Sequence, residues 1–202
     1  MDKINKLKKI NILRCGWLTY KLRKFDLELW IKINEKYLIP NSLDRWEQRY
    51  LEDKKQCKNS NLGSEGIESK LKKIKEKYLL LREYDQKLYD DEIKQFELNL
   101  ELIKRGHEIF ELEKNIEENK DKIVGLLKEM HLLYDEKLQI QKARPHLMDL
   151  FVEKLKQNEI SISKDIMYDM QRKADAGISK KAINQFETAI KNLGEYQELL
   201  LS

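Results

Sequence analysis

Proline and glycine, the two residues that most often interrupt regular structure, are scarce in this chain. Only Pro40 and Pro145 occur, so residues 41–144 contain no proline, and there are seven glycines in 202 residues. Proline breaks helix interiors and glycine loosens them, so their scarcity favours long, uninterrupted helices. The mixture of 41% apolar and 38% charged residues points the same way.

Cysteine and long apolar runs are also lacking. Cys15 and Cys57 are the only cysteines, and they show no metal-binding or CxxC spacing. We therefore expect two free, reduced thiols and no disulfide framework. No segment has the roughly 18 consecutive apolar residues of a membrane-spanning helix, and the short apolar run before Arg14 is no signal-peptide core. These features predict a cytoplasmic protein.

The excess positive charge is confined to one end of the chain. The net charge is +4, yet residues 1–25 alone carry eight basic residues and one acidic residue. A local field of this sign attracts phosphates, anionic lipid or an acidic protein surface, although a solvated helix face has the same composition. The candidate patch for an anionic partner comprises Lys3, Lys6, Lys8, Lys9, Arg14, Lys21, Arg23 and Lys24.

Within the helical stretch 67–144, one apolar seam runs from Ile67 to Phe110 in steps of three and four residues, with Asp85 and His107 as its polar positions, and it resumes at Ile116. That spacing keeps one helix face against a partner over many turns. A second apolar stripe, including Leu80, Tyr84, Leu98 and Leu102, widens this face, so we expect the helix to meet two neighbours, as in a three- or four-helix bundle. The residues proposed for the partner-binding seam are Leu81, Tyr89, Ile93, Phe96, Leu100, Ile103 and Phe110.

The seam is interrupted at residues 117–122, which are all polar. Two interpretations fit this interruption. Asn119 is either a buried polar residue that fixes the register of a continuous coiled coil, or part of an exposed turn in a helical hairpin. We favour the hairpin with its turn at 117–122.

The remaining segments read as shorter helices. Residues 3–14 form a basic amphipathic helix, and residues 17–39 fit a helix better than an isolated strand. Ser42 is the expected cap of the next helix, and Pro145 is expected to begin a new one. The domain division is an N-terminal helical region at 1–57, a linker at 58–66, a long helix or hairpin at 67–144, and a C-terminal helical cap at 145–202. The predicted fold is an all-α, elongated helical bundle or coiled coil.

Motifs for catalysis or cofactor binding are not found. His107, His131 and His146 lack the partners of a di-iron bundle or a zinc-protease helix. No glycine-rich phosphate loop or nucleophile elbow occurs. We therefore predict no catalytic, metal-binding or cofactor-binding residues, and a protein that is not an enzyme.

The C-terminal run from Gly177 to Phe186 resembles two different motifs. It looks like the turn and recognition helix of a helix-turn-helix, but Arg172 and Lys173 occupy positions where that motif has an apolar and a small residue. It also resembles the second helix of a tetratricopeptide repeat, but no second repeat follows. We interpret it as a helical hairpin that packs in a bundle.

These features lead to three functional hypotheses. The first is a non-enzymatic assembly or adaptor subunit whose long amphipathic helices bind a protein partner or a second copy. The second is a nucleic-acid-binding accessory protein that uses the basic N-terminal helix and the C-terminal hairpin. The third is a helical module that lies on an anionic membrane surface.

Overall fold

The computed structural model describes residues 17–33, 39–60, 63–176 and 180–202, and it is all-α over these ranges. The α-helices are α2 (Trp17–Ile33), α3 (Ile39–Lys58), α4 (Ser64–Leu112), α5 (Ile116–Gln157), α6 (Lys164–Ala176) and α7 (Lys180–Leu201). A 3₁₀ segment, η3 (Glu113–Asn115), joins α4 to α5. The predicted fold class is confirmed, and the predicted basic helix at 3–14 lies outside the described residues.

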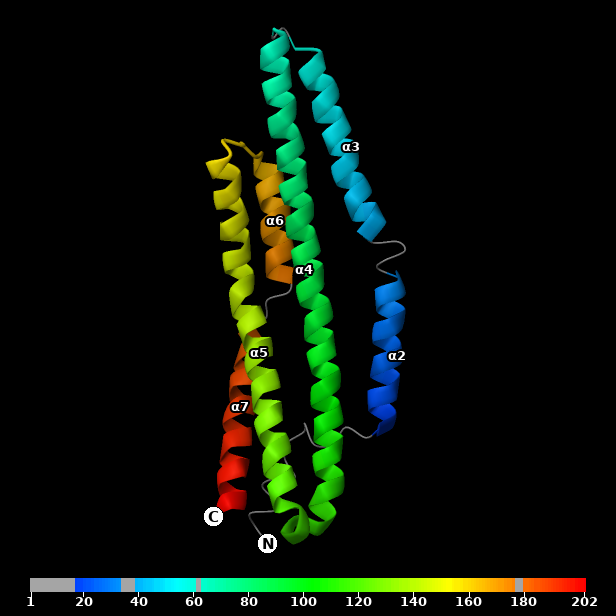
Figure 1. Cartoon of the computed structure of the whole chain (residues 1–202), viewed down its shortest axis with the longest axis vertical. Coiled ribbons are helices and arrows are strands. Elements are labelled where there is room, and N and C mark those ends of the chain that lie inside the picture. Colours follow the sequence, from blue (N-terminus) through cyan, green and yellow to red (C-terminus); the bar gives the residue numbers. More distant parts are fainter. Residues whose placement is uncertain (1–16, 34–38, 61–62, 177–179) are drawn as a thin grey trace. The chain divides into compact units, whose positions relative to one another are not determined.

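Helices α4 and α5 form an antiparallel hairpin that reverses at η3 (Figure 1). Gln141 on α5 donates a hydrogen bond to Gln95 on α4, and Arg105 on α4 pairs with Glu129 on α5 at 2.7 Å. In one straight helix, residues 95 and 141 would lie roughly 70 Å apart, at 1.5 Å per residue. The hairpin interpretation is therefore correct, and the continuous coiled coil is excluded.

The reversal comes earlier than predicted. Residues 117–122 lie in the first turns of α5, while the chain turns at Glu113–Asn115. The amide of Asn119 donates hydrogen bonds to the carbonyls of Leu112 at 3.3 Å and Asn115 at 3.0 Å. Carbonyls at a helix end have no partner within the helix, so Asn119 closes the turn and is not a buried register residue.

The described residues divide into two compact units. Unit 1 holds residues 17–29, 92–142 and 180–202, and unit 2 holds residues 30–33, 39–60, 63–91 and 143–176. Helices α4 and α5 contribute to both units. The units therefore cut across the sequence-based segments 67–144 and 145–202, because each unit takes one half of the hairpin and one C-terminal helix.

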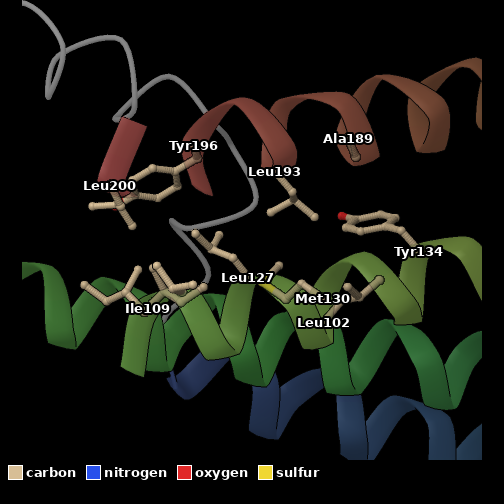
Figure 2. Packing of buried hydrophobic residues seen from close by; sticks show 11 residues of the cluster. Leu102, Ile109, Leu127, Met130, Tyr134, Ala189, Leu193, Tyr196 and Leu200 are labelled. Atoms are coloured by element: carbon tan, nitrogen blue, oxygen red, sulfur yellow. The ribbon is translucent and has the colours of Figure 1, made fainter. Parts of the chain in front are cut away.

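The core of unit 1 is formed by α4, α5 and α7. Leu102 and Ile109 of α4 and Leu127 and Met130 of α5 face Leu193 of α7 and its neighbours (Figure 2). Ile109, Ile123, Met130 and Tyr196 are completely buried. The Tyr196 hydroxyl donates to Glu113, which ties the end of α7 to the reversal.

The core of unit 2 is formed by α3, α4, α5 and α6. Its packed aromatic rings include Trp46 and Tyr78, with centroids 6.2 Å apart, and Tyr84 and Phe151, at 5.4 Å. The hydroxyl of Tyr84 donates to the carbonyl of Met170 at 2.9 Å, so α6 is held to α4 by a buried hydrogen bond. Burial and the nearby Asp85 carboxylate raise the pKa of Tyr84 to about 12.

Both predicted helix starts next to a proline are wrong. Helix α3 begins at Ile39, so Ser42 lies inside its first turn and does not precede the helix, and proline is tolerated that early. Pro145 lies within α5, and it is exposed while Met148 and Phe151 are buried. Packing of those side chains holds the helix together across a residue that cannot donate a backbone hydrogen bond.

Loop positions agree better with the prediction. The linker predicted at 58–66 contains the loop between α3 and α4, although α4 already begins at Ser64. The stretch from Ile160 to Ser163 separates α5 from α6 as expected. The predicted break at Gly177 and cap at Ser179 lie outside the described residues.

Candidate partner-binding surface

The two apolar stripes of α4 are buried to different extents in unit 1. Leu98, Leu102 and Ile109 of the second stripe are buried, at 3%, 4% and 0% exposure. Phe96 and Phe110 of the predicted seam remain 41% and 46% exposed. The seam residues between them, Leu100 and Ile103, are half-buried, as is Ile93 just before Phe96. The stripe expected to be secondary therefore forms the core, and the seam is left partly open to solvent.

The two seam residues nearest the start of α4 belong to unit 2. Leu81 is 1% exposed and packs in the core of that unit, and Tyr89 is half-buried. Leu81 is thus used inside the chain. The part of the seam with exposed apolar surface is the stretch from Ile93 to Phe110 in unit 1.

Helix α2 lies beside α4, on the side away from α7 (Figures 1 and 2). Leu27 is 7% exposed, whereas Phe25 and Leu29 are 63% and 47% exposed. At about 100° per residue, Phe25 and Leu29 share one face of the helix, and Leu27 points to the opposite side. Helix α2 therefore carries large apolar side chains on two opposite faces, and one of these faces is open to solvent in unit 1.

The exposed face of α2 was not predicted as a site. The sequence showed that Leu18, Leu22, Phe25, Leu29 and Ile33 share a helical stripe. The available signal was that apolar residues lie on more than one side of the segment, which in a soluble protein indicates a helix with neighbours on more than one side. Phe25 and Leu29, together with Phe96 and Phe110 of α4, are here called the unit 1 apolar surface.

The predicted basic patch is only partly described. Lys21, Arg23 and Lys24 are exposed on α2. Lys3, Lys6, Lys8, Lys9 and Arg14 lie outside the described residues. The structure therefore places three of these cations on the surface of α2.

A polar layer crosses the hairpin in the interior of unit 1. Lys137 is only 4% exposed, donates a hydrogen bond to Asn99, and lies 4.2 Å from the centre of the Phe186 ring of α7. Gln141 and Gln95 form the next pair along the hairpin. Burial lowers the pKa of Lys137 to about 8. An amine enclosed in this way has little access to a substrate, so we interpret the layer as a device that fixes how α4 and α5 pair.

A second polar network joins three helices of unit 2. The indole of Trp46 on α3 donates to Asp85 on α4 at 2.7 Å. Lys173 on α6 donates to both carboxylate oxygens of Asp85 at 2.8 Å, and to Asp169 at 3.1 Å. Asp85 is one of the two polar residues of the predicted seam, and this network accounts for it.

Unit 2 also contains a polar groove of about 530 Å³ between α3, α4 and the segment leading into α6. Most of its charged side chains pair with one another. Lys77 and the Tyr78 hydroxyl both donate to Asp53, and Arg49 lies 3.7 Å from Asp165. Burial and the Asp53 carboxylate raise the pKa of Tyr78, and a hydrogen bond from Ser163 lowers that of Asp165. Most of the charges that line the groove are thus already paired within the protein.

The structure shows few features that would hold a metal or a cofactor. Within the described residues, no group of three or more His, Cys, Asp or Glu side chains is placed to hold a metal ion. Cys57 is buried and is not in a disulfide, and its thiol lies 3.8 Å from the carbonyl of Ile67. None of the helices in the described part of the chain is long and apolar enough to cross a bilayer.

The predicted C-terminal hairpin is divided between the two units. Ile166, Met170 and Ala174 of α6 belong to the core of unit 2, whereas Ala189 and Leu193 of α7 belong to the core of unit 1. In a helix-turn-helix, the two helices pack together in one core and present one of them to DNA. The core memberships of α6 and α7 do not reproduce that arrangement.

Comparison with known proteins gives no relatives for this chain: no protein-family model and no curated protein matches its sequence, and no solved structure matches its fold.

Proposed function

We propose that this protein is a non-enzymatic assembly or adaptor subunit that binds another protein chain through the unit 1 apolar surface. The observation that carries the proposal is the exposure of Phe25 and Leu29 on one face of α2, whose opposite face already buries Leu27. An apolar helix face left open in a folded chain is typical of a protein interaction site.

The seam of α4 adds further exposed apolar side chains in unit 1. Phe96 and Phe110 lie on one face of the helix and keep almost half of their area exposed. Burying a large apolar side chain contributes roughly 1.5–3 kcal/mol, and aromatic residues are enriched among those that dominate interface energies.

An isolated exposed leucine on α5 provides a contrast with the unit 1 apolar surface. Leu132 is 70% exposed on α5, but its neighbours on the outer face of that helix, including His131 and Asp135, are polar and exposed. A single exposed leucine of this kind is normal for a protein surface. It therefore offers a matched control that changes one exposed leucine outside the proposed surface.

The test compares three proteins: the wild type, the Phe25→Ser/Leu29→Ser variant and the Leu132→Ser variant. Light scattering measures self-association, and affinity capture from the host measures binding to another protein. We expect the wild type and Leu132→Ser to form the same complex and Phe25→Ser/Leu29→Ser to lose it. A wild type that stays monomeric and captures no discrete protein would refute the proposal, as would equal binding by all three proteins.

A further inference from the structure

We propose that one side of the α3–α4 helix pair in unit 2 binds an anionic membrane surface. This side shares no residue with the unit 1 apolar surface, so the inference goes beyond the proposed function. It rests on two columns of exposed lysine and leucine side chains that the fold brings together.

A local excess of lysine occurs where α3 is joined to α4. The two helices run antiparallel, side by side (Figure 1). Residues 54–75, which span the connection, contain seven lysines and two glutamates. The charge of longer segments conceals this excess, because acidic residues in the remainder of both helices balance it. The expectation that excess positive charge is confined to residues 1–25 is therefore too narrow.

Two ion pairs fix the register of α3 against α4. Arg82 pairs with Glu47, and Lys77 pairs with Asp53. In an antiparallel pair with this register, three further residues of α3 lie level with residues of α4 to within about 1.5 Å, the rise of one residue. The level pairs are Leu51 with Leu79, Lys55 with Lys75, and Lys58 with Lys72.

These six residues lie on one side of the helix pair. Residues 51, 55 and 58 follow Glu47 along α3 in steps of three and four, and residues 79, 75 and 72 precede Arg82 along α4 in the same steps. Such steps keep side chains on one helix face. Because Glu47 and Arg82 contact each other, both columns face the same side. The six residues are called the lysine–leucine face.

All members of the lysine–leucine face are exposed. Leu51 and Leu79 are 52% and 53% exposed. Within the described part of the chain, the side chains of its four lysines form no ion pair and no hydrogen bond. Glu68 lies one turn before Lys72 in the same column and is exposed, so one carboxylate stands against four lysines.

Lysines at the same level on adjacent helices repel each other. Packed helix axes are about 8–10 Å apart, which is close to the Debye length of roughly 8 Å at physiological salt, so the repulsion is only partly screened. An anionic surface removes this repulsion and attracts each lysine that lies near it. The face is therefore suited to a partner with many negative charges.

The composition of the face favours a membrane over other anionic partners. Protein interfaces are depleted in lysine and enriched in aromatic residues and arginine, whereas this face has four lysines and no aromatic residue. Nucleic acid offers phosphates to the lysines, but its backbone offers no apolar layer to Leu51 and Leu79. An anionic bilayer offers headgroups to the lysines and acyl chains to the leucines.

Sedimentation of the full chain with vesicles measures this binding. The vesicles consist of phosphatidylcholine, with or without phosphatidylserine. We expect the protein to bind only the vesicles that contain phosphatidylserine, and to bind them more weakly as the salt concentration rises, because salt screens the attraction.

Two double variants change the net charge equally and separate the face from a general charge effect. Lys55→Gln/Lys75→Gln changes the face, and Lys122→Gln/Lys128→Gln changes two exposed lysines of α5 in unit 1. We expect the first variant to bind about 20- to 30-fold more weakly, at about fivefold for each lysine, and the second to bind within about threefold of the wild type.

A second pair of variants tests the leucines. Leu51→Ser/Leu79→Ser should weaken vesicle binding by about tenfold or more, because the acyl chains lose their apolar contacts. Leu132→Ser, the exposed leucine of α5, should leave it unchanged. Phe25→Ser/Leu29→Ser should also bind vesicles normally, so a failure of the proposed function is distinguished from a failure of this inference.

Four outcomes would overturn the inference. The first is a wild type that does not bind phosphatidylserine vesicles. The second is equal weakening by the two lysine variants, which would show a general charge effect. The third is full binding by Lys55→Gln/Lys75→Gln, which would assign the binding to other cations such as those of residues 1–25. The fourth is lysine-dependent binding to a DNA duplex with vesicle binding that does not require the leucines, which would assign the face to nucleic-acid phosphates.

Discussion

The buried amine of Lys137 gives a quantitative prediction about stability and pH. Lys137 is 4% exposed, faces Asn99 of α4 and Phe186 of α7, and has a pKa lowered from 10.5 to about 8 by burial. The lowered pKa means that the charged form of Lys137 is less stable in the folded protein than in the unfolded chain. At 1.36 kcal/mol for each unit of pKa shift, keeping Lys137 charged at pH 7 lowers the free energy of unfolding by about 3 kcal/mol.

Replacing Lys137 by methionine removes this penalty and keeps a side chain of similar length. The variant loses the hydrogen bond to Asn99, which costs about 1 kcal/mol, and Asn99 is exposed enough to be hydrated instead. We therefore expect Lys137→Met to be more stable than the wild type by about 2 kcal/mol at pH 7. For a chain of this length, that difference raises the melting temperature by about 4–8 °C.

The two proteins should also respond differently to pH. Between pH 8 and pH 10.5, the folded wild type has released the Lys137 proton while the unfolded chain still binds it, so wild-type stability rises with pH in that window. The advantage of Lys137→Met should accordingly shrink as the pH increases from 7 to 10. Effects of other titrating groups, such as Tyr84 and Tyr196, cancel in the difference between the two proteins.

Urea unfolding followed by circular dichroism at several pH values measures the difference. Hydrogen exchange of amides in residues 92–142 assigns the effect to unit 1, because the two units need not unfold together. A difference in unfolding free energy that stays constant from pH 7 to pH 10 would refute the reasoning. It would show that the amine of Lys137 is solvated in the folded protein.

Three further predictions concern single contacts, each measured as a change in unfolding free energy by urea titration. Tyr84→Phe removes the buried hydrogen bond to Met170 and should destabilise unit 2 by about 1–2 kcal/mol, and an unchanged value would mean that this bond does not form. Asn119→Leu removes two hydrogen bonds at the reversal and should cost about 1–2 kcal/mol, whereas a more stable variant would restore the buried register interpretation. Pro145→Ala returns a backbone donor to the interior of α5 and should stabilise the chain by about 1–3 kcal/mol, and a destabilised variant would contradict the helical path through this residue.

Much of the fold could be predicted from the sequence, because helical periodicity depends on local spacing. The hairpin followed from the polar run at 117–122, although the turn itself lies a few residues earlier. Periodicity shows where apolar residues stop facing a partner. The position of the reversal depends instead on which backbone carbonyls at the end of α4 can accept hydrogen bonds. Asn119 does this from inside α5, and its role depends on contacts that a one-dimensional pattern does not contain.

Pro145 shows a second limit of sequence reasoning. Local preference ends a helix before a proline, yet α5 continues because Met148 and Phe151 bury themselves in the core of unit 2. Tertiary packing outweighed a local cost of about 3 kcal/mol. The division into two units was unpredictable for the same reason, since it depends on how distant halves of α4 and α5 pair.

The candidate surface was predicted only in part. The sequence spacing puts the seam residues of α4 on one helix face, but it does not tell which of the two apolar stripes is buried. The buried stripe contains Leu98, Leu102 and Ile109, and the exposed stripe contains Phe96 and Phe110. Phe25 and Leu29 were overlooked because their segment could be read as a strand or a helix, and only the folded α2 shows which side Leu27 occupies.

The most direct test of the central claim is photo-crosslinking in host cells from a reactive residue placed at position 25. The same residue at position 132, which is also exposed, serves as the control. We expect a discrete covalent adduct with a protein from position 25 and none from position 132. The adduct should have twice the mass of the chain if the partner is a second copy. No discrete protein adduct from position 25, or the same adduct from both positions, would contradict it.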